Sequence, residues 1–479
     1  MAYLYGASVQ GIQDFIFKTN RLQEIVGASE IVKSIQDKFS SEYKPKEVLL
    51  NAAGNMKAVF DKEECEKVVL LFPQHVMNLA YGVSISQAVV SMIEDTPTQE
   101  EINELEKKLK IQRNKPTIPL DMGLGIFKVN PSTAKPIIAD TTNRDKATNQ
   151  KLKENTKFFE KNANARNFKS LSELSNGKNK IAVIHADGNG LGIIIPKLKS
   201  MGLTLSLFSK KLDEATQNAF NRAKDDDMRI RDVILGGDDM VVLCSADDAL
   251  RFTKNYLTYF EEETQHVIGH KFTACAGIAY MNEKYPFHYA IDLAEELCTK
   301  TKKHAKKINQ DMAPSSLMFH NIQGSNYQNW KKFVEDELTV ANDKRVESED
   351  SNSTVRLDFG PYYLNEVNQP SIETFMEIIE LYAKENSPIS KLRSWMGELY
   401  KSDEYAKRIL DRINVMSQQN SDWDEKLINK KLNSLYASLS TSNLIVQKDS
   451  EKNKYRNEVN LHKTPIYDIL QILAATEVK

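Results

Sequence analysis

Residues 181–320 show the most regular succession of apolar and mixed segments in the chain. Apolar, β-branched runs predict buried strands at residues 181–187, 230–243, 272–280 and 316–319. Apolar residues at helical spacing predict helices at residues 205–223, 246–267 and 287–307. The order strand, helix, hairpin, helix, strand, helix, strand favours an α+β fold in which an antiparallel sheet is backed by helices.

The first 130 residues follow a similar order. A strand starts at Tyr3, with turns expected at Gly6 and Gly11, and a helix is predicted at residues 24–39. A hairpin follows at residues 48–60, with Gly54-Asn55 as its turn signal. The rest of this unit is predicted as a helix around Val76, a strand at 81–85, a helix at 98–110 and a strand at 120–129.

The order of these elements suggests that the chain contains a duplication. Three pairs of segments align: residues 7–11 with 186–190, 52–55 with 236–239, and 81–83 with 276–278. The first copy lacks every carboxylate that the second copy presents at these positions.

Two further regions differ from the repeated units. Residues 131–180 are rich in Asn, Lys, Thr and Ser, which indicates an exposed, partly helical linker. Beyond Trp330 the pattern is almost wholly helical, and it predicts a bundle with helices at residues 374–384, 389–400, 403–416, 423–438 and 466–476. We therefore divide the chain into residues 1–130, 131–180, 181–325 and 326–479.

Composition narrows the class of protein. The 479 residues carry a formal charge of −2, so the overall charge gives no reason to expect tight binding of nucleic acid. The four cysteines include no Cys-x-x-Cys pair, which argues against a zinc ribbon and against a disulfide framework. The apolar runs are too short for a membrane span and no signal peptide is evident, so a cytoplasmic protein without a membrane partner is expected.

The strongest chemical signal is Gly236-Gly237-Asp238-Asp239, which lies between two apolar runs. This pattern predicts a tight hairpin with paired carboxylates at its tip. Gly and Asp are common turn residues, so a merely solvated turn is an equal alternative when this motif is considered alone. Adjacent carboxylates are also suited to holding a divalent cation, which prefers hard oxygen ligands.

A second motif adds weight to the metal interpretation. Asp187 ends a predicted buried strand, and the glycine-rich run from Gly188 to Gly192 follows it. If this strand and the hairpin are neighbours, Asp187, Asp238 and Asp239 converge at one end of the sheet. Such a cluster would hold two Mg²⁺ or Mn²⁺ ions. The backbone N–H groups of Gly188, Asn189, Gly190 and Leu191 would then suit a triphosphate.

Other known binding motifs match the sequence less well. The glycine run is one residue short of Gly-x-Gly-x-x-Gly, and no phosphate-binding Gly-x-x-x-x-Gly-Lys-Ser/Thr is present. His266 and His270 lack the Glu of a His-Glu-x-x-His zinc motif, and His185 receives no role. The basic run from Lys300 to Lys307 is mainly a solvated helix end. Lys302 and Lys303 are our candidates for contact with a γ-phosphate.

These motifs, in this order, resemble the palm domains of the CRISPR polymerases, the large subunits of type III CRISPR effector complexes. The resemblance is carried by residues 186–192 and 236–239, and by Gly11-Ile12-Gln13-Asp14-Phe15-Ile16-Phe17 near the N-terminus. A more distant resemblance extends to the GGDEF and class III nucleotide cyclases. The resemblance to the CRISPR polymerases implies two ferredoxin-like palm domains, the first without catalytic residues, and a helical C-terminal domain.

The family's second palm converts ATP into cyclic oligoadenylate messengers used in antiviral defence. The resemblance implies Asp187, Asp238 and Asp239 as catalytic metal ligands. It also implies nucleotide contacts by Gly188–Leu191 and by Gly236 and Gly237, with Asn189 reaching the base or ribose. Ser209 is a further candidate for contact with adenine.

Several departures favour a compact signalling enzyme over a subunit of a large complex. No His-Asp nuclease domain precedes the first palm, and no cysteine cluster separates the palms. The alternatives are an RNA-binding scaffold subunit, or a cyclase that makes a cyclic mononucleotide or cyclic di-GMP. ATP or another nucleoside triphosphate is the expected substrate. An activating RNA, a regulatory partner protein and a homodimer are left open as partners.

Overall fold

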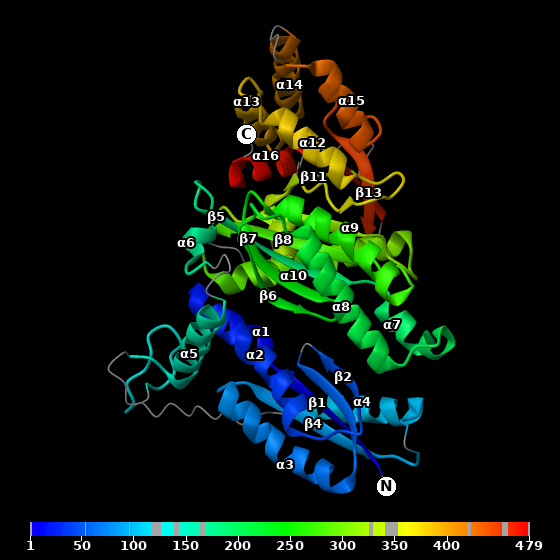
Figure 1. The fold of residues 1–479 in the computed structure, drawn as a ribbon. Helices are drawn as coiled ribbons and strands as arrows, with labels where there is room; N and C mark the ends of the chain where they lie inside the picture. Colours follow the sequence, from blue (N-terminus) through cyan, green and yellow to red (C-terminus); the bar gives the residue numbers. More distant parts are fainter. Residues whose placement is uncertain are drawn as a thin grey trace.

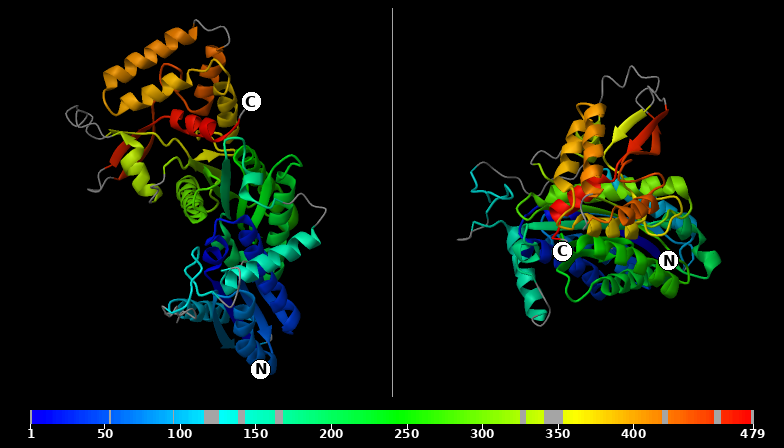
Figure 2. Two further views of the ribbon diagram at one scale, coloured as in Figure 1. Left: turned by 90° about the vertical axis from the view of Figure 1, so that its left-hand side faces the viewer. Right: turned by 90° about the horizontal axis from the view of Figure 1, so that it is seen from above.

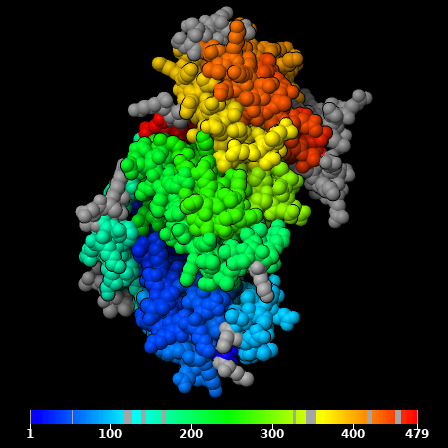
Figure 3. All heavy atoms as spheres, turned by 45° about the vertical axis from the view of Figure 1, so that its right-hand side comes forward, coloured from blue at the N-terminus to red at the C-terminus, as the bar shows by residue number. Residues whose placement is uncertain are grey.

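The computed structural model describes residues 2–52, 54–94, 96–115, 126–137, 143–162, 168–324, 329–340, 353–418, 423–452 and 458–477. Three parts follow one another along the long axis of the molecule, with the N-terminal part at one end and the C-terminal part at the other (Figures 1 and 3). The first unit comprises β1 to α4, and the second unit comprises β5 to β9. An α+β architecture of sheets backed by helices is thus confirmed.

The first unit is a four-stranded sheet in the order β2-β3-β1-β4, in which β1 pairs antiparallel with both of its neighbours. The chain runs through β1 without the turn expected at Gly6, and the turn comes at Gly11. Its elements are β1 (Tyr3–Gln10), α1 (Ile12–Phe17), α2 (Leu22–Glu42), β2 (Glu47–Ala52), β3 (Asn55–Phe60), α3 (Lys62–Leu79), β4 (Ser84–Ser91) and α4 (Gln99–Arg113). The strand expected at 120–129 falls partly outside the described residues, and Val129 forms only an isolated bridge with Pro136.

The second unit repeats this arrangement in the strand order β6-β7-β5-β8, and the sheet is extended by β9 and by β12 (Tyr362–Tyr363), which comes from the C-terminal part. The sheet is mixed, because β9 runs parallel to β8 where the sequence predicted only antiparallel pairing. Its elements are β5 (Lys180–Gly188), α7 (Leu191–Ile194), the 3₁₀ helix η1 (Ile195–Met201), α8 (Leu205–Ala223), β6 (Ile230–Gly236), β7 (Asp239–Ser245), α9 (Ala249–Ile268), β8 (Ala274–Asn282), α10 (Phe287–Ile308) and β9 (Ser316–Asn321).

The predicted duplication agrees with the topology of the two units. β1, β2, β3 and β4 occupy the same places in their sheet as β5, β6, β7 and β8 occupy in theirs. Gly11 and Gly190, which the sequence alignment pairs, are both left-handed residues before a short helix, with φ of 70° and 78°. A residue with a side chain is strained in this conformation, so glycine at both positions has a physical reason.

The two units contact each other reciprocally. The long helix α8 of the second unit packs against β2, and the long helix α2 of the first unit packs against β6 (Figure 1). Ser29 on α2 donates a hydrogen bond to the carbonyl oxygen of Val233, and Lys33 forms a 3.2 Å ion pair with Asp232. The core cluster of buried apolar residues is continuous across both units, so they are packed as one body.

The segment between the units is partly helical, as predicted, with α5 (Lys146–Lys161) and α6 (Leu171–Leu174). Helix α5 packs along α2, on the side of the first unit (Figure 2).

The C-terminal part is rich in helices, as predicted, but it also contains a four-stranded sheet that the sequence did not indicate. That sheet has the order β10-β11-β14-β13, with β11 parallel to β14. The elements are α11 (Trp330–Glu337), β10 (Thr339–Val340), β11 (Ser353–Arg356), β12 (Tyr362–Tyr363), α12 (Ile372–Tyr382), α13 (Ile389–Leu399), α14 (Asp403–Gln418), α15 (Glu425–Leu435), β13 (Val446–Lys452), β14 (Glu458–Lys463) and α16 (Ile466–Ala475). Within the described residues, no helix combines the length and apolar character needed to cross a bilayer.

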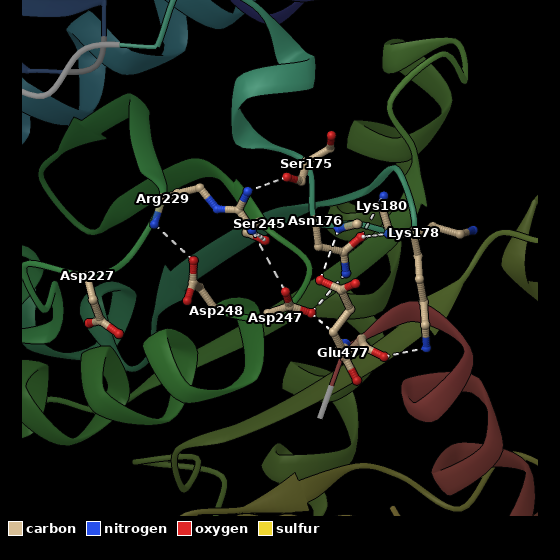
Figure 4. A network of polar contacts seen from close by, with 12 residues as sticks. Ser175, Asn176, Lys178, Lys180, Asp227, Arg229, Ser245, Asp247, Asp248 and Glu477 are labelled. Atoms are coloured by element: carbon tan, nitrogen blue, oxygen red, sulfur yellow. Dashed lines mark hydrogen bonds and ion pairs between the residues drawn. The ribbon is translucent and has the colours of Figure 1, made fainter. Parts of the chain in front are cut away.

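The end of the chain is fastened to the loop that leads into β5 (Figure 4). The N–H of Gly177 donates to Oε2 of Glu477 at 3.0 Å, and the N–H of Glu477 donates to Oδ1 of Asp247 at 2.7 Å. Lys178 donates to the carbonyl oxygen of Leu473 at 2.8 Å. These contacts hold α16 against the second unit at the end of β5 opposite Asp187.

Candidate active site

The three aspartates meet at one end of the second unit's sheet. β5 and β7 are antiparallel neighbours, and Asp187 lies directly opposite Asp239 in their register. The N–H of Gly188 donates to the carbonyl oxygen of Asp238 at 3.1 Å, which joins the end of β5 to the turn between β6 and β7. A β-carbon on Gly188 would lie only 2.8 Å from that of Asp238, so this approach requires glycine.

Helix α8 holds the turn that carries Asp238. The N–H of Gly237 donates to Oδ1 of Asp213 at 3.2 Å, and the hydroxyl of Thr216 donates to the carbonyl oxygen of Gly237. The N–H and the carbonyl group of Gly237 are therefore both held by side chains that lie one turn apart on α8. Sequence reasoning missed Asp213 and Thr216, and their only signal was two polar residues spaced i, i+3 on a helix that precedes the turn.

Crowding of the carboxylates alters the acidity of the site. Burial, together with the charges of Asp187 and Asp239, raises the pKa of Asp238 to about 7. Nε2 of His185 lies 3.0 Å from Oδ1 of Asp239. Burial alone would lower the pKa of His185, but the hydrogen bond and charge of Asp239 outweigh it, and the pKa is raised. His185, to which the sequence assigned no role, thus lies in contact with the site.

Lys302 reaches the site from α10. Its Nζ lies 2.7 Å from Oδ2 of Asp187 and 2.6 Å from the carbonyl oxygen of Gly188. Lys303, our other candidate, is exposed, because the next residue on a helix points about 100° away. Ser209 lies half-buried on α8, one turn before Asp213.

The glycine-rich loop differs from the expectation in two ways. Asn189 is completely buried, and its side-chain amide donates to Thr273 Oγ1 at 3.1 Å and to the carbonyl oxygen of Ala313 at 3.0 Å. The side chain of Asn189 ties the loop to neighbouring segments, and its expected contact with a base or ribose stays a prediction. The N–H groups of Gly188 and Asn189 are likewise used, by Asp238 and Thr273. The expected phosphate contacts by backbone N–H groups remain a prediction only for Gly190 and Leu191.

The donor types suit a hard divalent cation, because three carboxylates and the carbonyl oxygen of Gly188 lie at the same end of the sheet. As they stand, the described residues offer no group of three or more His, Cys, Asp or Glu side chains arranged to hold a metal ion. Asp187 is instead paired with Lys302, and Asp239 lies beside His185. The carboxylates fit the cation chemically, and their binding of it stays a prediction.

Residues 180–311 match the family model for the second palm domain of Cas10/Cmr2. This part of the chain is similar to a Cas10-type palm domain. It covers β5 to α10 and contains all three aspartates. No curated protein sequence matches the chain.

Solved structures extend the likeness of fold beyond this palm domain. The Csm1–Csm4 cassette in complex with AMPPNP matches 99% of this chain and 70% of that chain, with 15% identity and a TM-score of 0.51. The cassette in complex with cA3 matches 99% of this chain and 69% of that chain, with 14% identity and a TM-score of 0.50. In the cassette with one ATP, the match covers 63% of this chain and only 53% of that chain (16% identity, TM-score 0.44), so the matched part is about half of that chain's length.

The first unit is the structural counterpart of the Cas10-type palm but carries different residues. Ser8 lies opposite Asn55 in the register of β1 and β3, as Asp187 lies opposite Asp239. The hydroxyl of Ser8 donates to Oδ1 of Asn55 at 2.9 Å. Gly54 takes the place of Asp238 in the turn, and Ala53 beside it lies outside the described residues. The first unit therefore replaces the acidic cluster with neutral groups.

One part of the predicted duplication is wrong. Ala7 pairs with Gln87 across β1 and β4, and the equivalent Ala186 pairs with Ala276 across β5 and β8. The residues equivalent to 276–278 are therefore 87–89, where the sequence alignment gave 81–83. The sequence alignment matched Gly82, which lies in the turn before β4, with Gly277, which lies within β8.

A cavity of about 700 Å³ lies between the first unit and the palm domain. Asp239 and Gly236 stand at its wall, so it is continuous with the acidic site. The other polar side chains that line it include Lys33, Gln36, Asn51, Asp213, Gln217 and Asn221. Sequence reasoning identified none of these residues as lining a shared cavity, because they come from three elements that meet only in the folded chain.

Proposed function

We propose that this protein is a metal-dependent nucleotidyltransferase that converts ATP into a cyclic oligonucleotide used as a signal in antiviral defence. The observation that carries the proposal is the acidic cluster at the end of β5, with Asp239 in the wall of the cavity shared by the two units. The likeness to the Cas10/Cmr2 palm supports it. The Csm1–Csm4 cassettes of similar fold hold AMPPNP and cA3 in their solved structures.

In the proposed reaction, the 3′-hydroxyl of one nucleotide attacks the α-phosphorus of another in line. A new P–O bond forms, the bond to the β-phosphate oxygen breaks, pyrophosphate leaves and the hydroxyl proton passes to solvent. Two divalent cations, when bound, would lower the pKa of the attacking hydroxyl and neutralise charge on the phosphates. Asp187, Asp238 and Asp239 would hold them.

The other residues would position these groups. Asp213 and Thr216 fix the turn that carries Asp238, and His185 orients Asp239. A rigid arrangement matters because small displacements of reacting groups cost large factors in rate. The cavity between the units would receive the nucleotide base and sugar, and its amide side chains can donate to and accept from a base.

The test is to incubate purified protein with ATP and Mg²⁺ or Mn²⁺ and to analyse the products by mass spectrometry. Replacing both Asp238 and Asp239 with Ala should abolish the product, because two of three cation ligands are lost. The matched control replaces the exposed Asp225 and Asp226 with Ala, which removes the same charge from the loop before β6 and should keep activity.

The proposal fails if no phosphodiester product forms from any nucleoside triphosphate, with or without single-stranded RNA. An active double variant would equally rule out the assigned site. The cassettes of similar fold contain a second protein, Csm4, so binding of a partner protein belongs to the proposal and is tested by repeating the assay with such a partner.

A further inference from the structure

Lys302 occupies a position that a metal ion would be expected to take. Its amine is held between two oxygen atoms, Oδ2 of Asp187 at 2.7 Å and the carbonyl oxygen of Gly188 at 2.6 Å. A carboxylate and a backbone carbonyl oxygen are the ligands that hard divalent cations take in proteins. The side chain of Lys302 is 21% exposed and that of Asp187 is 37% exposed, so the pair lies at the mouth of the site and is open to solvent.

We propose that the Lys302 amine stands in for one divalent cation in the nucleotide-free protein and leaves Asp187 when that cation binds. The proposal rests on the proposed function, in which Asp187 is a cation ligand. Lys302 is thus a positioning residue that sets how tightly the site takes up metal.

Electrostatics makes the two occupants mutually exclusive. A divalent cation binds carboxylate oxygens at about 2.0–2.6 Å. An ammonium group 2.7 Å from the same oxygen would then lie within about 5 Å of the metal, where two positive charges repel. The cation and the amine therefore compete for Asp187, and uptake of one requires release of the other.

The structure also indicates that only the side chain has to move. On either side of Lys302, Thr301 and Ala305 of α10 are completely buried. His304, half a turn further along, contacts the hydroxyl of Tyr363 and lies 3.2 Å from Oδ1 of Asp449. The helix is therefore anchored to the C-terminal part, while the long side chain of Lys302 has rotamers that reach solvent.

Binding of Mn²⁺ to the nucleotide-free full-length chain, followed by electron paramagnetic resonance, tests the proposal. Lys302→Met and Lys302→Gln should lower the Kd of one Mn²⁺ by about tenfold, within the range usual for coupled binding events. Lys303→Met, which removes an equal charge one residue away, should stay within about twofold of the wild type, since exposed charges are screened.

A second measurement needs no variant. Acylation of lysine amines on the wild-type protein, read by mass spectrometry, should increase at Lys302 when Mn²⁺ is added and stay unchanged at Lys303. The proposal is overturned if the wild type binds Mn²⁺ but neither Lys302 variant binds it more tightly, or if labelling of Lys302 does not rise. The proposed function survives that result, whereas a wild type that neither binds Mn²⁺ with ATP nor forms product refutes both.

Discussion

Crowding of carboxylates at the end of β5 should make the metal-free protein less stable at neutral pH, and Asp238→Asn tests this. Because burial and the neighbouring aspartates raise the pKa of Asp238 from 3.8 to about 7, the native state holds this proton more tightly than the unfolded chain does. The unfolded chain ionises first as the pH rises. The free energy of unfolding therefore falls between about pH 4 and about pH 7 and stays lower above that range.

The size of this loss in the free energy of unfolding follows from the difference between the pKa values of Asp238 in the native and unfolded states. A pKa difference of about 3 corresponds to about 4 kcal/mol in the free energy of unfolding, because one pKa unit is worth about 1.4 kcal/mol. Asp238 is partly exposed at its turn, and water reduces the repulsion, so a measured difference of about 2 to 4 kcal/mol is expected at pH 8. Asparagine keeps the shape of the side chain and removes the charge.

Urea unfolding in EDTA, followed by circular dichroism at pH 5, 6, 7 and 8, is the assay. Asp238→Asn should be increasingly more stable than the wild type as the pH rises to 7, and the gap should then remain constant. Asp225→Asn, at an exposed position, should follow the wild type at every pH. A gap that is absent at pH 8, or that does not change with pH, would refute the reasoning.

Two further predictions concern packing. Gly277→Ala should lower the free energy of unfolding by about 3 kcal/mol or more, because the added β-carbon would lie 2.0 Å from the carbonyl oxygen of Ala294. Gly192→Ala should be tolerated, because a β-carbon there would meet open space. Thermal unfolding measures both variants. Lys463→Met should cost about 2 kcal/mol in urea unfolding, because it removes the ion pairs of the buried Lys463 with Asp449 at 3.0 Å and with Asp358 at 3.8 Å. An equal loss in exposed Lys401→Met would contradict this.

The acidic motifs were readable in the sequence because each lies in one short segment. The glycines of the turn and of the loop after β5 mark places where the chain bends or approaches another segment closely. The apolar runs beside them indicate buried strands. Asp187, Asp238 and Asp239 could therefore be named together before their proximity was known.

Contacts between distant segments could not be read in this way. Strands β11, β13 and β14 have no marked alternation of apolar residues, and β13 carries four charged residues among seven, so they indicated no sheet. Strand β11 pairs with β14 about 100 residues further along the chain, and this pairing supplies hydrogen bonds that the local sequence does not reveal.

The sequence by itself determined the order of elements in the second unit, the existence of a duplication and the three carboxylates, because these depend on local periodicity and on turn chemistry. Only the tertiary structure decided what surrounds the carboxylates. Lys302 lies 115 residues from Asp187 and still contacts it, and Asn189 is buried by residues from two other loops. The first unit shares a cavity with the palm because helices α2 and α8 pack reciprocally, and such packing depends on the surfaces of both units together.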